Sequence, residues 1–154
     1  MLHSRYPDQV CSIARTLEVI GERWSLLIVR DALAGLSRFE EFQRSLGVAR
    51  NVLSARLEHL VAEGVLARTP YGPSGRRQAY RLTDKGRELA TPVIALMSWG
   101  DRHYLAPGGP PRQVEHAGCG GEIEPRLVCA DDGRAVGVSD VKVLPGPGWP
   151  HPHD

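Results

Sequence analysis

The stretch from residue 47 to residue 83 constrains the fold of this chain more than any other part of its sequence. Its first half has apolar residues at helical spacing, which predicts an amphipathic helix with one buried stripe: Leu53, Leu57, Leu60 and Val61. Gly64 then ends the helix, because glycine adopts the left-handed conformation without a steric penalty. Two strand-like runs follow, VLARTPY and QAYRLT, separated by the tip GPSGRR. A helix, a strand, a basic tip and a second strand, in this order, predict a winged helix-turn-helix.

The face of this helix opposite the apolar stripe is short-chained and polar at its start, as a helix end that enters a DNA groove needs to be. The residues expected on or beside that face are Val48, Arg50, Asn51, Val52, Ser54, Ala55, Arg56 and Glu58. An asparagine amide can pair with adenine, and an arginine can bind a guanine or a phosphate. The predicted DNA-binding residues, including two arginines of the tip, are therefore Arg50, Asn51, Ser54, Arg56, Arg76 and Arg77.

The distribution of charge supports this prediction, although the whole chain carries a net charge of only +1. Residues 48–87 contain eight arginines and lysines against three acidic residues, a net charge of +5. Residues 1–47 are neutral, and residues 88–154 carry −4. Positive charge is thus concentrated on the unit that would meet phosphates. An ordinary solvated basic face is the alternative explanation.

Three shorter helices are predicted before this unit. The first begins at Cys11 and ends at Gly21, and the second runs from about Trp24 to Leu33. The third opens at SRFE with a capping box, in which Ser37 and Glu40 satisfy each other's backbone amides. Gly47 makes the tight turn into the next helix, so that the third and fourth helices form the helix-turn-helix pair.

A long helix, about residues 84–104, is predicted after the second strand, with Thr83 as its cap. Pro92 is expected to kink it. Its apolar set has nothing obvious left to cover it, which favours dimerisation over packing within its own domain: Leu89, Val93, Leu96, Met97 and Trp99 or Gly100.

The predicted domains are a DNA-binding and dimerisation domain at residues 1–105, a Pro/Gly linker at 106–112, a small β-rich appendage at 113–144 and a disordered tail at 145–154. An Asp132–Gly133 turn is expected in the appendage. The sequence shows no internal repeat. The fold class is therefore mainly α with a small β wing (α+β).

Composition excludes several other classes of protein. No apolar run approaches the roughly 18 residues of a membrane span, and the start of the chain has no signal-peptide pattern, so a cytoplasmic protein is expected. Three cysteines at uneven spacing argue against a disulfide scaffold. The sequence has no P-loop, GxSxG or HExxH motif, and we predict no enzymatic activity.

Three blocks of the sequence, CSIARTLEVIGERWSLLIVRDALAG, SRFEEFQRSLGVARNVLSARLEHLVAEGVL and YRLTDKG, resemble the HxlR family of bacterial winged-helix transcriptional regulators. The similarity covers about residues 10–105. It implies a homodimer that binds an inverted-repeat operator, with a recognition helix in the major groove and the wing over adjacent backbone or minor groove. It leaves the effector open, and a small-molecule or electrophile signal is possible within the family.

The resemblance makes Cys11 a candidate redox sensor, because several relatives sense thiol-reactive compounds through a cysteine at this position. A thiol at a helix N-terminus can be activated by the helix dipole, and Arg15 lies one turn on. The alternative is a small packing residue.

Four residues of the appendage have the paired spacing of zinc-ribbon knuckles: His116, Cys119, Cys129 and Asp132. Aspartate is a harder ligand than cysteine and would weaken a structural zinc site. A degenerate ribbon that folds without metal is the alternative.

These observations together predict a sequence-specific DNA-binding transcriptional regulator, a repressor, that acts as a homodimer. The alternative is a winged helix that serves as a protein-interaction module without DNA binding, for which a neutral or acidic recognition face would be expected.

Overall fold

The computed structural model describes residues 6, 9, 11–104 and 107–149 of the chain. It separates into two compact units, one ending at Val93 and the other beginning at Ile94. The predicted linker at 106–112 and tail at 145–154 fall partly outside the described residues.

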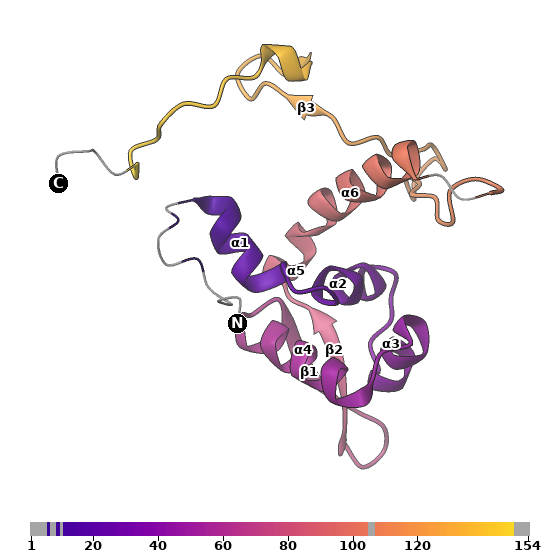
Figure 1. Ribbon diagram of the computed structural model, residues 1–154. Coiled ribbons are helices and arrows are strands. Elements are labelled where there is room, and N and C mark those ends of the chain that lie inside the picture. Colours follow the sequence, from indigo (N-terminus) through magenta and orange to yellow (C-terminus); the bar gives the residue numbers. More distant parts are fainter. Residues whose placement is uncertain (1–5, 7–8, 10, 105–106, 150–154) are drawn as a thin grey trace. The chain divides into compact units, whose positions relative to one another are not determined.

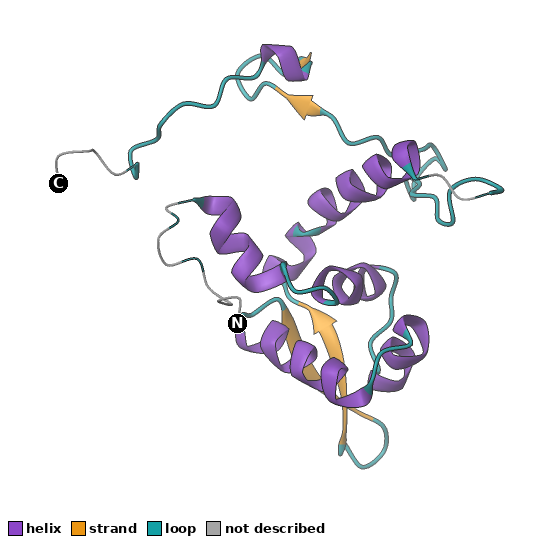
Figure 2. Ribbon diagram, in the orientation of Figure 1, coloured by secondary structure: helices purple, strands orange, loops and turns teal. Residues whose placement is uncertain are grey.

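The first unit is a winged helix-turn-helix, as predicted (Figure 1 and Figure 2). Its elements in chain order are α1 (Ser12–Ile20), α2 (Ser25–Leu33), α3 (Phe39–Leu46), α4 (Arg50–Ala62), β1 (Leu66–Tyr71), β2 (Arg77–Leu82) and α5 (Asp84–Glu88). Helix α2 lies at the centre and packs against α1, α3, α4 and β2.

The core of this unit is built on the apolar stripe of α4. Leu53, Leu57 and Leu60 are fully buried, which confirms the helical periodicity of the sequence. Truncation of one such leucine to alanine typically costs about 2–5 kcal/mol of stability. Fully buried apolar side chains from the neighbouring elements complete the core: Ile28, Val29, Phe42, Val65 and Leu66.

Val48 is also buried, so its predicted place on the outward face is wrong. Helix α4 begins only at Arg50, and Val48 lies in the preceding turn, where helical periodicity does not apply. Gly47 makes that turn with a φ of 62°, as predicted. Ala49 is the N-cap and makes no side-chain cap hydrogen bond.

Only the carboxylate half of the predicted capping box of α3 is formed, and it lies one residue later than predicted. Arg38 is the N-cap, and the carboxylate of Glu41, not Glu40, accepts hydrogen bonds from the backbone N–H groups of Ser37 (3.0 Å) and Arg38 (2.9 Å). The cause is tertiary. The Ser37 carbonyl accepts a hydrogen bond from Tyr80 N–H at 2.7 Å, and Arg38 is bridged to Ala79, so this segment stays extended against β2.

The wing is a two-stranded antiparallel sheet in which Leu66 pairs with Leu82 and Tyr71 with Arg77. The sequence predicted that Arg77 lies in the tip, but in the structure it is the first residue of β2. Arg76 remains in the tip and is exposed.

The single helix predicted for residues 84–104 is two helices, α5 and α6 (Ala90–His103), separated at Leu89. Pro92 cannot donate a backbone hydrogen bond and would clash with the carbonyl of Glu88, so a break here places the proline in the first turn of α6. Thr83 caps α5 as predicted, because its Oγ1 accepts a hydrogen bond from Gly86 N–H at 3.1 Å. The same hydroxyl donates to the Gly64 carbonyl, which ties α5 to the end of α4.

The division between the two units falls within α6, and the rest of the second unit has little regular structure. Two short strands, β3 (Leu127–Val128) and β4 (Ala135–Val136), pair antiparallel, and a 3-10 turn η1 follows at Val138–Asp140. The turn between the strands contains Gly133 with a φ of 72°, which confirms the Asp-Gly turn. None of residues 107–149 is buried.

No helix within the described residues is long and apolar enough to span a lipid bilayer.

Candidate nucleic-acid interface

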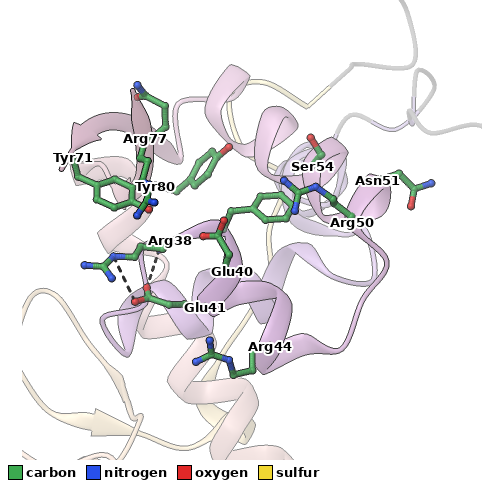
Figure 3. Close-up of a pocket in the computed structure, with 12 residues that line it drawn as sticks. Arg38, Glu40, Glu41, Arg44, Arg50, Asn51, Ser54, Tyr71, Arg77 and Tyr80 are labelled. Atoms are coloured by element: carbon green, nitrogen blue, oxygen red, sulfur yellow. Dashed lines mark hydrogen bonds and ion pairs between the residues drawn. The ribbon is translucent and has the colours of Figure 1, made fainter. Parts of the chain in front are cut away.

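A groove of about 1150 Å³ opens between α3, the first turn of α4 and the wing (Figure 3). Its position follows from the fold, because Gly47 turns α4 away from α3 while β2 pairs with the extended residues before α3. The residues that line it are Arg38, Phe39, Glu40, Glu41, Arg44, Arg50, Asn51, Ser54, Tyr71, Arg77, Gln78 and Tyr80.

Aromatic rings support two of the four arginines in this groove. The guanidinium carbon of Arg50 lies 4.6 Å from the centroid of the Phe39 ring, and that of Arg38 lies 5.1 Å from the Tyr71 ring. A cation–π contact at an exposed site contributes about 0.5–1 kcal/mol. Stacking covers the face of a guanidinium and leaves its N–H edge available for phosphate or base oxygens.

The first turns of α4 present two uncharged polar groups to the same groove. Asn51 is exposed, and its amide points away from the wing in Figure 3. Ser54 is half-buried and donates a hydrogen bond from Oγ to Glu58 Oε1 at 3.2 Å. These two side chains and Arg50 therefore lie on one margin of the groove, opposite Arg77 of the wing.

Two glutamates reduce the net positive charge of the residues that line the groove. Hydrogen bonds from the backbone N–H groups of Ser37 and Arg38 hold the pKa of Glu41 below its usual value, with a smaller contribution from the charges of Arg38 and Arg44. Glu41 is thus an anion that fixes the start of α3. Four arginines against Glu40 and Glu41 leave the lining with a net charge of +2.

Two of the predicted DNA-binding arginines lie outside this groove. The Arg56 Nη1 atom is 3.4 Å from Glu22 Oε1, so its side chain is directed toward the turn between α1 and α2. Arg76 lies at the exposed tip of the wing. The structure therefore brings together Arg50, Asn51, Ser54 and Arg77 of the predicted set.

Sequence reasoning missed eight of the residues that line the groove: Arg38, Phe39, Glu40, Glu41, Arg44, Tyr71, Gln78 and Tyr80. Arg44 belongs to α3 and Arg38 is its N-cap, and the sequence marked this helix only as the first of the pair. Two signals could have found some of them. Each strand of the wing carries a tyrosine, Tyr71 or Tyr80, and Arg38 directly precedes a helix start.

The family model described as HxlR-like helix-turn-helix matches residues 19–107, more than half of the chain. The chain belongs to this family. The resemblance inferred from the three sequence blocks is thereby confirmed.

Relatives of this HxlR-like protein are similar over most of their length. The HTH-type transcriptional regulator Rv3095 of Mycobacterium tuberculosis is 44% identical over 138 residues, which cover 90% of this chain and 87% of Rv3095. The crystal structure of PA1607, a candidate transcription factor, is 44% identical, with a TM-score of 0.79 and coverage of 89% of this chain and 96% of PA1607. The reduced form of the redox regulator HypR is 30% identical, with a TM-score of 0.56, and covers 60% of this chain and 92% of HypR.

These matches identify this HxlR-like protein as a transcriptional regulator of helix-turn-helix type. The prediction of no enzymatic activity agrees with that class of function. Because the matches to Rv3095 and PA1607 cover about nine-tenths of the chain, they include most of the 47 residues that follow residue 107, where the match to the family model ends.

The residues predicted for sensing and for metal binding lie away from the groove. Cys11 is exposed and is the N-cap of α1. In the appendage, His116 Nδ1 lies 3.2 Å from Cys119 Sγ, while Asp132 is paired with Arg134. Among the described residues, no three His, Cys, Asp or Glu side chains gather into a set that could hold a metal ion.

Proposed function

We propose that this HxlR-family regulator binds an inverted-repeat operator as a homodimer and represses transcription there. The observation that carries the proposal is the groove, which combines arginines stacked on aromatic rings with the polar first turns of α4. In this mode of binding, Asn51 and Arg50 read base edges in the major groove, and Arg76 and Arg77 contact phosphates or the adjacent minor groove. Arg38, the N-cap of α3, and Arg44 of α3 add phosphate contacts.

Exposed apolar side chains on two helices support a homodimer. Ile13 of α1 is 70% exposed and Leu17 is 41% exposed. On α6, Leu96 and Trp99 are 53% and 49% exposed. Apolar residues at helical spacing that stay exposed on one chain are typical of a subunit interface. A two-fold dimer presents two recognition helices to the two halves of an inverted repeat.

The signal that this regulator senses is proposed to be a thiol-reactive compound or another small molecule. Cys11 is exposed and is the N-cap of α1, so its thiol is accessible to a reactive compound. HypR, to which the chain is 30% identical, is a redox regulator.

A gel-shift titration with DNA from upstream of the protein's own gene tests the proposal. We expect a dimer–DNA complex whose log affinity falls linearly with log salt, by about 0.9 unit for each neutralised phosphate. The double variant Arg76→Ala/Arg77→Ala removes up to four phosphate contacts from the dimer, so it should bind all DNA more weakly, with a salt slope smaller by about four units.

The matched control, Arg112→Ala/Arg126→Ala, removes the same charge from the second unit and should leave the salt slope unchanged. If the wild-type protein shifts no DNA, and instead retains a protein partner, the interaction-module alternative is correct. Repression is tested separately by transcription in vitro from the bound promoter, which should decrease as protein is added.

A further inference from the structure

The appendage contains two backbone turns of the same construction, although the sequence shows no repeat. In the first, His116 N–H donates to the Gly121 carbonyl and Gly120 N–H donates to the His116 carbonyl, both at 2.8 Å. In the second, Cys129 N–H donates to the Arg134 carbonyl and Gly133 N–H to the Cys129 carbonyl, both at 2.9 Å. The two turns are therefore superimposable in hydrogen-bond pattern, thirteen positions apart.

The conformation and flanks of the turns agree as well. Gly120 has a φ of 69° and Gly133 a φ of 72° at the equivalent position. Each turn is also the tip of a short hairpin in the same register, since Glu115 pairs with Glu122 as Val128 pairs with Ala135. Only an alanine and this glycine are shared by the two sequences, which explains why no repeat is visible in them.

Each turn presents donor side chains at its first and fourth positions. In the first turn, His116 Nδ1 and Cys119 Sγ are 3.2 Å apart. Two such ligands of one tetrahedral zinc ion are separated by roughly 3.5 Å, given Zn–N and Zn–S bonds of about 2.0 and 2.3 Å. The His116 ring lies folded over the turn, because a Cβ at Gly118 would be 2.9 Å from its Cε1 atom. The equivalent positions of the second turn are Cys129 and Asp132.

The appendage lacks the apolar core that would hold these two hairpins together. No residue from 107 to 149 is buried, and several large apolar side chains are exposed: Ile123, Leu127, Val128, Val138, Val141, Val143 and Leu144. The predicted appendage of residues 113–144 has 32 residues. Domains below about 40 residues usually need a disulfide, a metal ion or association to be stable. The three cysteines are free thiols.

We propose that the two turns are the two halves of one structural metal site, which binds a tetrahedral divalent ion of the zinc class through His116, Cys119, Cys129 and Asp132. Four protein ligands would close the coordination shell, which is typical of a structural and not a catalytic site. In this structure the two pairs lie in separate turns, so binding joins the hairpins and supplies the cohesion that the core lacks. Both cysteines bind as thiolates, and their two protons pass to solvent.

Asp132 is the weakest of the four ligands. Its Oδ1 accepts a hydrogen bond from Arg134 N–H at 2.9 Å, and its Oδ2 is 2.8 Å from both Nε and Nη2 of Arg134. A carboxylate has about four acceptor sites, so it can bind an ion while it keeps an outer hydrogen-bond partner. The guanidinium of Arg134 nevertheless competes with the metal ion for the negative charge of the Asp132 carboxylate.

Metal analysis of the full chain, purified without a histidine tag from zinc-supplemented cells and then dialysed, tests the site. We expect about one zinc ion per chain. Cys119→Ser and Cys129→Ser should each lose most of it, while the matched control Cys11→Ser should keep it. Circular dichroism should show the winged helix intact in all three variants. Wild-type zinc no higher than in the double variant Cys119→Ser/Cys129→Ser overturns the proposal, as does zinc that persists in both single variants.

Two further measurements keep the proposal open to refutation if a serine variant misfolds. Wild-type protein loaded with Co²⁺ should show tetrahedral absorption and a thiolate-to-cobalt charge-transfer band, and an octahedral spectrum without that band contradicts it. Asp132→Cys should bind zinc more tightly than the wild type in competition with a chromophoric chelator, because it replaces a paired carboxylate by a softer thiolate. Equal zinc affinity of the wild type and Asp132→Cys would mean that Asp132 is not a ligand. The proposed site of four ligands would then be wrong.

Discussion

Asn51 and Arg77 occupy opposite margins of the groove, and their side chains are suited to different tasks. An amide recognises one base edge through two directed hydrogen bonds, whereas a wing arginine meets phosphates that are the same at every position. Asn51→Ala should therefore relax the preference at one base position, at a cost of about 1–3 kcal/mol on the preferred operator. Selection from a randomised operator library, followed by affinity measurements, checks this prediction.

Arg77→Ala is the contrasting variant, because it should weaken binding to all sequences alike and leave the base preference intact. An unchanged preference in Asn51→Ala would mean that α4 enters the DNA groove in another orientation.

Among the elements, α3 depends on one carboxylate for its start. Backbone hydrogen bonds lower the pKa of Glu41 in the folded protein, so its ionised form stabilises the fold. A carboxyl group with a depressed folded pKa contributes its full stabilisation above its unfolded pKa of about 4.3, and loses it as the pH falls through the folded value. Glu41→Gln should therefore lower the free energy of unfolding at neutral pH, and the difference from wild type should shrink in acid.

Urea unfolding at a series of pH values measures this difference. Glu40→Gln, one residue earlier on the exposed side, is the control and should leave the pH dependence of stability unchanged. A Glu41→Gln difference that stays constant with pH would assign the stabilisation to packing and not to charge.

For the whole molecule, operator binding is expected to depend on association of two chains. Ile13→Asp places a charge on an apolar side chain that is 70% exposed in one chain, so it should leave the fold of that chain intact. If α1 belongs to the dimer interface, the variant should sediment as a monomer, and its operator affinity should fall by about 10²–10⁴-fold through loss of bivalent binding. Analytical ultracentrifugation and gel shifts measure the two effects.

Val138→Asp introduces the same charge at an apolar residue of the appendage that is 82% exposed. It should remain dimeric and bind the operator normally. If Ile13→Asp remains dimeric, the dimer interface does not include this part of α1.

The local features of this protein were predictable from its sequence, because each depends on interactions within a few residues. The leucine stripe of α4, the left-handed Gly47 and the Thr83 cap all lie where the sequence placed them. The wing followed from two strand-like runs separated by a short basic tip. One margin of the groove was predictable too, since Arg50, Asn51 and Ser54 share one face of a helix whose buried side was already known.

The remainder was decided by contacts between residues far apart in the chain. The hydrogen bond between Ser37 and Tyr80 holds the segment before α3 extended and moves the helix start by one residue. The same contact brings Arg38 and the tyrosines of the wing into the groove, while Glu22 draws Arg56 away from it. Helical periodicity assigns a side chain to a face, but only tertiary packing determines what lies opposite that face.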